Sequence, residues 1–381
     1  MVDGIKFNGG NFQAKANFFE NAENKEKYKN ILDHLTKNEA YLGNEGSKAT
    51  HTGNGNIDNI EITNFVSHID KGADGGKGDG VITDDEIMAW AKANGQEFHE
   101  SLVKTGFDEL KNFLYAIAGN NVATSEVDTN GDGIKDKLTT ITDSKGNLIY
   151  EAWNDKAEGA NEHVTTFNYD DNGNFLGKTH QERLTKAADG SDYGIGTTKY
   201  NANNKKTEQF VYLDENGDGK QDKTISRFFN EKEQLSTTAT KSYDANGKLA
   251  WSESASYFYY SNGTSTSNNE YDNNGDGKMD SAAQVFYDKQ GKETQRNVDS
   301  NLNGNYDTST TYKYEADGSS THYSRFDAND DGIYDKASLS KYNSKLDLIE
   351  ILEDEDLNGF ADKKATYSDI ENGTVSMMKY I

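Results

Sequence analysis

The chain has 381 residues, enough for two or three domains, and it carries 65 Asp and Glu against 40 Lys and Arg, a formal charge of −25. This charge excludes nucleic acid and anionic membrane surfaces as partners, because both bind through basic patches. Cysteine is absent, only 33% of residues are hydrophobic, and no apolar run approaches the roughly 18 residues of a membrane span, so disulfides, a thick core and a transmembrane helix are excluded.

Residues 14–118 are predicted to be helical, because apolar side chains recur there at spacings of three and four. These side chains are Tyr28, Ile31, Leu32 and Leu35, and then Leu102, Val103, Phe107, Leu110, Leu114 and Ile117. At 119–127 the period changes to two, and Thr, Ser and Tyr dominate the remaining residues. The sequence therefore predicts an α+β protein of two domains, an all-α domain at 1–120 and an all-β domain at 121–381.

The predicted β domain is repetitive. Nine-residue segments of the form D-x-[DN]-x-[DN]-x-x-x-D begin at Asp128, Asp214, Asp272, Asp299, Asp327 and Asp354, and the last three spacings are 27, 28 and 27 residues. Plainer turns stand between these acidic loops, as in YDDNGN (169–174), YDANGK (243–248), YDKQGK (287–292) and YEADG (314–318). Each repeat is thus expected to contribute two strands, one acidic loop and one plain turn.

This order predicts a repetitive antiparallel meander, in which successive turns lie on opposite edges of the sheet. All acidic loops are then expected on one edge, about 9–10 Å apart if the sheet is regular. Roughly seventeen strands exceed what an open twisted sheet usually holds. An elongated ribbon or solenoid is the favoured architecture, and a β-propeller is the alternative.

The acidic loops are predicted to bind calcium. Ca²⁺ takes six to eight oxygen ligands, and carboxylates or amides at alternate positions of a curling loop converge on one ion. In DENGDGKQD (214–222), Gly219 allows the bend after the third donor. The predicted donors are Asp214, Asn216, Asp218, the Lys220 carbonyl and Asp222; then Asp128, Asn130, Asp132 and Asp136; Asp272, Asn274, Asp276 and Asp280; Asp299, Asn301, Asn303 and Asp307; Asp327, Asn329, Asp331 and Asp335; and Asp354, Asp356, Asn358 and Asp362.

The loop that begins at Asp299 has one charge fewer than the others and is expected to bind most weakly. Magnesium is the alternative ion, although it prefers fewer protein ligands. Asp, Asn and Gly are also ordinary turn residues, but six copies with Asp at the ninth position favour ion binding.

These loops resemble the calcium loops of thrombospondin type 3 repeats and of integrin-type β-propeller hairpins, in which the last side-chain donor also stands at position nine. They lack the position-twelve Glu of an EF-hand, since Thr139 and Ile225 stand there. The plain YDxxG turns resemble the YD-repeats of Rhs-type shells, from which we infer no function. The resemblance implies about six calcium ions in the β domain.

The helical half carries a second pattern, G-[ND]-G-x-I-x-x-x-E, in TGNGNIDNIE (52–61) and in KGDGVITDDE (77–86). It resembles the second half of an EF-hand loop, whose Gly turns the chain, whose Ile joins a short β-bridge and whose Glu closes the site. The resemblance implies one or two further calcium sites, although the first halves of both loops depart from the family. An alternative is a pair of acid-capped helix starts. The implied ligands are Asn54, Glu61, Asp70, Asp74, Asp79 and Glu86.

Catalytic patterns are not evident. The seven histidines form no H-E-x-x-H or comparable pair and are interpreted as surface or incidental residues, and no nucleophile elbow or phosphate loop is found. No catalytic residue and no organic cofactor are therefore predicted, and the chain is interpreted as a non-enzyme.

The sequence favours a secreted or surface-exposed bacterial structural protein, an adhesion, matrix or filament component whose repeats fold and stiffen with calcium. No secretory signal is visible at the start, so the export route is open. The expected partners are further copies in a homo-oligomer or filament, added at sheet edges, or a cell-surface or polysaccharide ligand. The alternatives are a secreted enzyme or effector braced by calcium, and a calcium sensor.

Overall fold

A computed structural model describes most of the β region and parts of the preceding segment. By contacts the chain divides into two compact units: unit 1 is Met1–Leu184 with Gly196–Lys205, and unit 2 is Thr185–Ile195 with Lys206–Ile381. The described residues are 5–6, 18, 21–29, 31, 65–67, 69–70, 80–93, 108–154, 162–185, 192–218, 220–366 and 379–380.

The described residues in the first part of unit 1 include three helices with defined bounds, one short strand pair and further helical residues at 65–67 and 69–70. The helices and strands with defined bounds are β1 (Ile5–Lys6), α1 (Ala22–Lys27), β2 (Val81–Ile82), α4 (Asp84–Ala93) and α6 (Asp108–Ile117). The predicted all-α domain is not confirmed, because β1 and β2 pair there and much of the segment lies outside the described residues. None of the described helices has the length and apolar character needed to cross a membrane.

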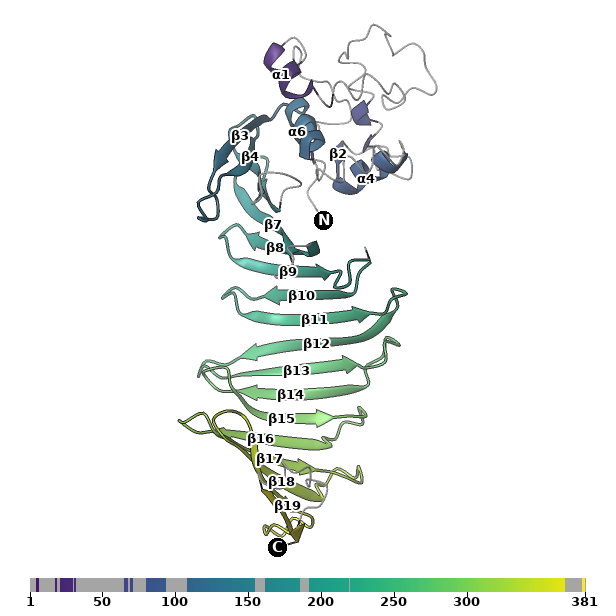
Figure 1. The fold of residues 1–381 in the computed structure, drawn as a ribbon, viewed down its shortest axis with the longest axis vertical. Helices are drawn as coiled ribbons and strands as arrows, with labels where there is room; N and C mark the ends of the chain where they lie inside the picture. The colour runs from purple at the N-terminus through teal and green to yellow at the C-terminus, as the bar shows by residue number, and fades with distance from the viewer. Residues whose placement is uncertain are drawn as a thin grey trace. The chain divides into compact units, whose positions relative to one another are not determined.

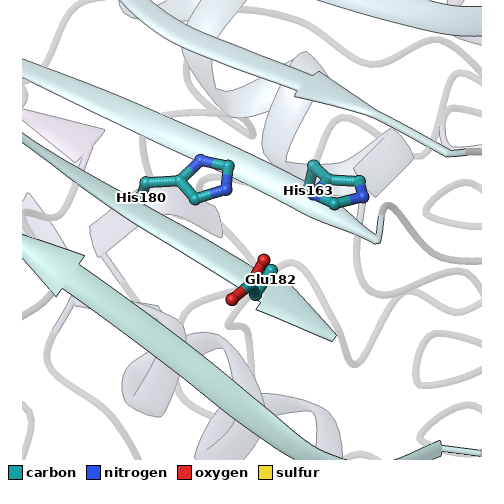
Figure 2. A group of neighbouring side chains, drawn as sticks. All are labelled: His163, His180 and Glu182. Carbon is teal, nitrogen blue, oxygen red and sulfur yellow. The ribbon is translucent and has the colours of Figure 1, made fainter. Parts of the chain in front are cut away.

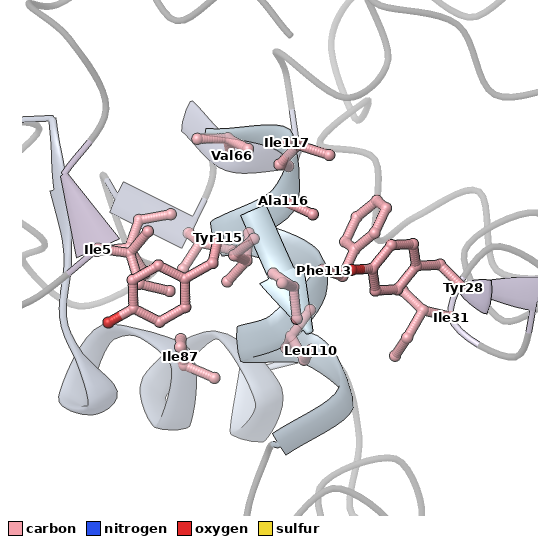
Figure 3. Packing of buried hydrophobic residues seen from close by; sticks show 14 of the residues in the cluster. Ile5, Tyr28, Ile31, Val66, Ile87, Leu110, Phe113, Tyr115, Ala116 and Ile117 are labelled. Carbon is pink, nitrogen blue, oxygen red and sulfur yellow. The ribbon is translucent and has the colours of Figure 1, made fainter. Parts of the chain in front are cut away.

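Helix α6 is central to the hydrophobic core of unit 1. Its Phe113 is fully buried, with its ring centroid 5.5 Å from that of Tyr28, and Figure 3 shows Tyr28 and Ile31 beside it. On the same helix, the Tyr115 ring lies 5.6 Å from that of Tyr150 in the sheet. The same buried cluster includes Ile141 of the sheet. Helical and strand residues thus share one core, and whether 1–120 is a separate domain stays a prediction.

The remaining described residues form mostly an antiparallel β meander, as predicted (Figure 1). In unit 1, β3 to β6 each pair antiparallel with the strand that follows, up to β7. The first strands are β3 (Asn121–Val127), β4 (Asp136–Thr142), β5 (Leu148–Trp153), β6 (His163–Tyr169), β7 (Phe175–Thr185) and β8 (Asp192–Asn201).

In unit 2 the same antiparallel pairing continues without a break from β9 to β21. A propeller would interrupt it after every fourth strand, so these ladders do not support the propeller alternative. The strands are β9 (Lys206–Leu213), β10 (Lys223–Phe229), β11 (Leu235–Tyr243), β12 (Leu249–Tyr259), β13 (Ser265–Asp272), β14 (Ser281–Tyr287), β15 (Glu293–Asp299), β16 (Thr308–Tyr314), β17 (Ser320–Phe326), β18 (Lys336–Tyr342), β19 (Leu348–Asp354), β20 (Lys363–Thr366) and β21 (Lys379–Tyr380).

The plain turns close their hairpins with an Asp or Asn side chain. Between β14 and β15, the Asp288 carboxylate accepts the N–H groups of Gln290 at 2.9 Å and Lys292 at 2.8 Å. Gly291 follows with φ of +78°, a left-handed conformation that costs a glycine little, and a bulge begins at Phe286/Tyr287. The recurring YDxxG motif is therefore the local chemistry of a hairpin with a bulge.

Unit 2 has little hydrophobic core in its described part. Its extensive packing contacts join strands that are neighbours in the sheet, and large apolar side chains stay exposed, such as Phe258 at 50% and Phe228 at 40%. Its buried hydrophobic residues are small: Ala255, Ala283, Val285, Ala337 and Ala365. Burial of so little apolar surface supplies little stability, so unit 2 needs another source of it.

Candidate metal centre

The six acidic loops share one internal geometry, seen clearly in the loop between β13 and β14. There the two carboxylate oxygens of Asp272 accept the N–H groups of Gly275 at 2.7 Å and Gly277 at 2.9 Å. At the end of the loop, Asp280 accepts the N–H of Asn273 at 2.7 Å. The side chains at positions one and nine, which stand at the two ends of the loop, therefore both point into the loop.

Positions three and five continue this pattern. The side-chain oxygen of Asn274 accepts the N–H of Asp276 at 2.9 Å, and Asp276 accepts the N–H of Lys278 at 2.8 Å. Hydrogen bonds from position two to nine, five to three and seven to five recur in every one of the six loops. The alternate spacing of donors therefore has a structural cause, since the side chains at positions three and five each accept the N–H two residues ahead.

Positions four and six require left-handed backbone, which explains the glycines of the motif. Gly275 has φ of +70° and Gly277 has φ of +85°. At position four, Leu302, Asp330 and Leu357 keep the left-handed φ without being glycine. The predicted role of Gly219 in the bend lies outside the described residues.

Two loops contain a carboxylate oxygen that hydrogen bonding leaves unsatisfied. Asp136 is fully buried, and its Oδ1 is buried without a hydrogen-bond partner, as is Oδ1 of Asp354. Oxygens of Asp354, Asp356 and Asp362 lie within 4.8 Å of one another. Two oxygens that share one Ca²⁺ at about 2.3–2.6 Å can lie up to about 5 Å apart, so this donor set fits a calcium ion.

The topology of unit 2 places its five acidic loops on one edge of the sheet, as the alternation of turns predicted. They follow β9, β13, β15, β17 and β19, whereas the plain turns at 230–234, 260–264, 288–292, 315–319 and 343–347 lie on the opposite edge. Asn301 Nδ2 donates to Asp330 Oδ2 at 2.9 Å, which joins two neighbouring acidic loops. The predicted row is therefore confirmed for this unit.

Hydrogen bonds hold several loop carboxylates in the ionised form. The Thr129 hydroxyl and N–H lower the pKa of Asp136, and Ser300 does the same for the pKa of Asp307. Burial raises the pKa of Asp272, but the backbone N–H groups of Gly277, Gly275, Asn274 and Asp276 together lower it by more. These groups have a lower pKa when folded than when unfolded, so they stabilise the fold above their unfolded pKa of about 3.9.

Acid is therefore expected to destabilise the loops, with stability lost as the pH falls below about 4 through the folded pKa values. Protonation also relieves repulsion among the excess acids, which acts in the opposite direction and is screened by salt. Thermal melts followed by circular dichroism between pH 5 and pH 3 measure the contribution of these hydrogen bonds to stability. Chelator removes bound ions, and high salt screens the repulsion. A melting temperature that rises steadily as the pH falls would contradict it.

The EF-hand-like residues are only partly described. Asn54, Glu61, Asp74 and Asp79 lie outside the described residues. Glu86 accepts the N–H of Thr83 at 2.9 Å, and its own N–H donates to the Thr83 hydroxyl at 3.3 Å, which is a capping box at the start of α4. Asp70 accepts the N–H of Gly80 at 3.1 Å. In this geometry Glu86 caps a helix, and its role as a closing calcium ligand stays a prediction.

One further cluster was missed at the sequence level. His163 on β6 lies beside His180 and Glu182 on β7, and their potential ligand atoms lie within 4.8 Å of one another (Figure 2). Interpreting the histidines as surface or incidental residues did not anticipate this cluster, in which both histidines are partly buried. Burial lowers the pKa of His180, and His163 lowers it further, whereas Glu182 opposes the shift. A sequence signal existed in H-x-E at 180–182, but only strand register adds the second histidine.

Comparisons with known proteins give little guidance. No protein-family model matches the chain, and no curated protein matches it. The chain is similar to part of the TcdB2-TccC3-Cdc42 structure, with a TM-score of 0.19 and 11% identity over 65% of this chain and 16% of that one. A porin-like protein from Bacteroides uniformis is similar with a TM-score of 0.23 and 13% identity, over 58% of this chain and 93% of that one. Likeness at this level supports no functional argument.

Proposed function

We propose that the protein is a calcium-binding structural protein whose β repeats fold and stiffen when the ion binds. The proposal is carried by the six loops of one internal geometry, together with the buried, unsatisfied oxygens of Asp136 and Asp354. Buried polar atoms in native proteins nearly always have a partner, and a cation supplies one for an acceptor oxygen. The Asp354, Asp356 and Asp362 cluster supports the proposal by its spacing.

Calcium would hold the first, third, fifth and ninth side chains of each loop while their backbone hydrogen bonds remain. Each of these side chains accepts N–H groups and keeps lone pairs for an ion, because an ionised carboxylate offers about four acceptor positions and an amide oxygen offers two. In the Asp299 loop, Asn301 and Asn303 stand at positions three and five. Its lower charge supports weaker binding than in the other loops.

A structural role follows from the thin packing of unit 2. Its strands pack mainly on their sheet neighbours and bury small side chains, so ions along one edge are a direct source of stability. In this proposal the protein works outside the cell or at its surface, in adhesion, matrix or filament assembly. The exposed aromatic side chains of Phe258 and Tyr260 are surfaces that a second copy or a polysaccharide can contact.

Calcium titration by calorimetry with parallel light scattering tests the proposal. We expect about six ions per chain from the β loops, and scattering that rises with occupancy if calcium drives assembly. Asp354→Asn is expected to remove or strongly weaken one site, because it removes one of the three clustered charges. Asp170→Asn is the control, since Asp170 caps a plain turn through the N–H groups of Asn172 and Asn174.

Either of two results would count against calcium binding in the loops. One is the absence of saturable binding at millimolar calcium. The other is an equal loss of ions in the Asp170 and Asp354 variants, which would show that general acidity attracts calcium rather than a built loop. Titration with magnesium in place of calcium tests the alternative ion.

A further inference from the structure

The His163 cluster lies on one face of three neighbouring strands of unit 1. In the ladder between β6 and β7, His163 stands opposite Glu182, and Thr165 stands opposite His180. Residues directly opposite each other, and residues two apart on one strand, share a face of the sheet. Trp153 of β5 stands opposite His163 and so belongs to the same face. The register alone therefore gathers two imidazoles and a carboxylate.

The two rings of the cluster are held by neighbouring side chains. The Trp153 ring stacks on His163, with centroids 4.7 Å apart and an interplanar angle of 12°. His180 Nδ1 is 2.9 Å from the hydroxyl of Thr165, which is itself 5% exposed. With Nδ1 engaged by a buried hydroxyl, Nε2 is the nitrogen that His180 can offer to an ion.

The neighbouring backbone also leaves room for the carboxylate. Gly196 of β8 is buried, and a Cβ at this position would lie 3.1 Å from Oε1 and 3.2 Å from Cγ of Glu182. That is tighter than an ordinary contact, so a larger residue at 196 would push Glu182 aside. Glycine thus preserves the position at which Glu182 meets the two histidines.

The donor set differs in kind from that of the acidic loops. Calcium and magnesium prefer oxygen ligands, whereas imidazole nitrogen suits zinc, copper, iron and nickel. Two histidines and one glutamate are three protein ligands, the number found in zinc sites that keep one coordination position open. A hydrogen bond to the second nitrogen of a metal-bound histidine fixes the orientation of its ring, and the Thr165 hydroxyl is placed to make one with His180.

We propose that His163, His180 and Glu182 form a site for a divalent transition-metal ion of the zinc class, separate from the calcium loops. The ligand atoms need to draw together from their 4.8 Å spread, because a zinc ion at about 2.0–2.2 Å from each ligand holds them closer than that. Side-chain rotation on a strand face provides this movement. The open position would be filled by water or by a small anionic or carbonyl ligand.

The test uses the full chain, with calcium in excess so that the acidic loops are occupied, and Zn²⁺ as the probe. Competition with a chromophoric zinc chelator gives affinity and stoichiometry, and Co²⁺ in place of Zn²⁺ gives a visible spectrum that reports the ligand geometry. We expect one zinc ion per chain, and a 100-fold or greater loss of affinity in His180→Gln. Thr165→Val is expected to weaken binding about 10- to 100-fold through lost support of the ring.

Two further variants keep the test decisive. Glu182→Gln preserves the size of the side chain and should lower affinity even if His180→Gln perturbs the fold. His322→Gln is the matched control: His322 is another partly buried strand histidine, packed on Tyr312 and Tyr342, and the change should leave zinc affinity unchanged.

Equal affinity in the wild-type chain and in both ligand variants would overturn the proposal, as would displacement of the zinc by further calcium. The cluster would then be a polar patch in which Glu182 balances a histidine charge. Failure of calcium binding alone leaves the zinc result unaffected, so the two proposals are tested independently.

Discussion

Removal of calcium by chelation is expected to unfold unit 2 or to lower its free energy of unfolding by on the order of 7 kcal/mol. An ion at ten times its dissociation constant adds RT ln(1+[L]/Kd), about 1.4 kcal/mol, for each site that only the folded state forms. The five sites of unit 2 together give on the order of 7 kcal/mol, against a typical domain stability of about 5–15 kcal/mol. Five of the six loops belong to unit 2, where the effect should concentrate.

Thermal melts followed by circular dichroism, in excess calcium and in EDTA, measure this effect. The β signal is expected to be lost at a much lower temperature in EDTA and to return when calcium is added back. Asp354→Asn should shift the calcium melt by only a fraction of the full effect, since one site of six is weakened. An unchanged melting curve in EDTA would show that calcium does not contribute to the stability of the fold.

Replacement of Gly275 by alanine is expected to destabilise unit 2 by about 2–5 kcal/mol. The left-handed φ of +70° costs an alanine about 1–2 kcal/mol. In addition, the new Cβ would lie 2.1 Å from the backbone oxygen of Leu249, and backbone cannot rotate away as a side chain can. The forced shift of the neighbouring strand adds about 1–3 kcal/mol, typical of overpacking.

Gly217→Ala is the matched control for this variant. Gly217 stands at the same position of another acidic loop of unit 2, with φ of +78°, but nothing lies within 4 Å of its added Cβ. Gly217→Ala should lower the free energy of unfolding only by the cost of the left-handed backbone, about 1–2 kcal/mol. Urea unfolding in saturating calcium compares the two, and equal losses of stability would mean that the contact with Leu249 does not constrain the loop.

The sequence predicted the β region well because its signals are local. Each turn is built from side chains that bond to their own backbone two or three residues on, as Asp288 and Asp272 do. Such contacts depend on composition over five to nine residues, which a sequence displays directly. The position of the acidic loops on one edge followed from counting, because antiparallel neighbours must alternate their turns.

The first part of the chain was predicted less well because its contacts are distant in sequence. Ile82 pairs with Ile5, and Phe113 packs against Tyr28, so neither partner lies within a local pattern. The capping box of Thr83 and Glu86 shows that one Gly-x-x-x-x-x-Glu pattern serves equally as a helix start. A local sequence pattern cannot distinguish a helix-capping glutamate from a calcium ligand, since both roles use the same carboxylate.

The sequence by itself determined the strand periodicity, the two kinds of turn and the alternation that puts five acidic loops of unit 2 in a row. Only the tertiary structure showed that α6 and the first strands share a core, that a Cβ at Gly275 would meet Leu249, and that His163 reaches His180 and Glu182. The reason is physical, because turns are stabilised by hydrogen bonds within a few residues. A core or a cross-strand cluster depends instead on strand register. Register brings together side chains that lie 17 to 19 residues apart in the sequence.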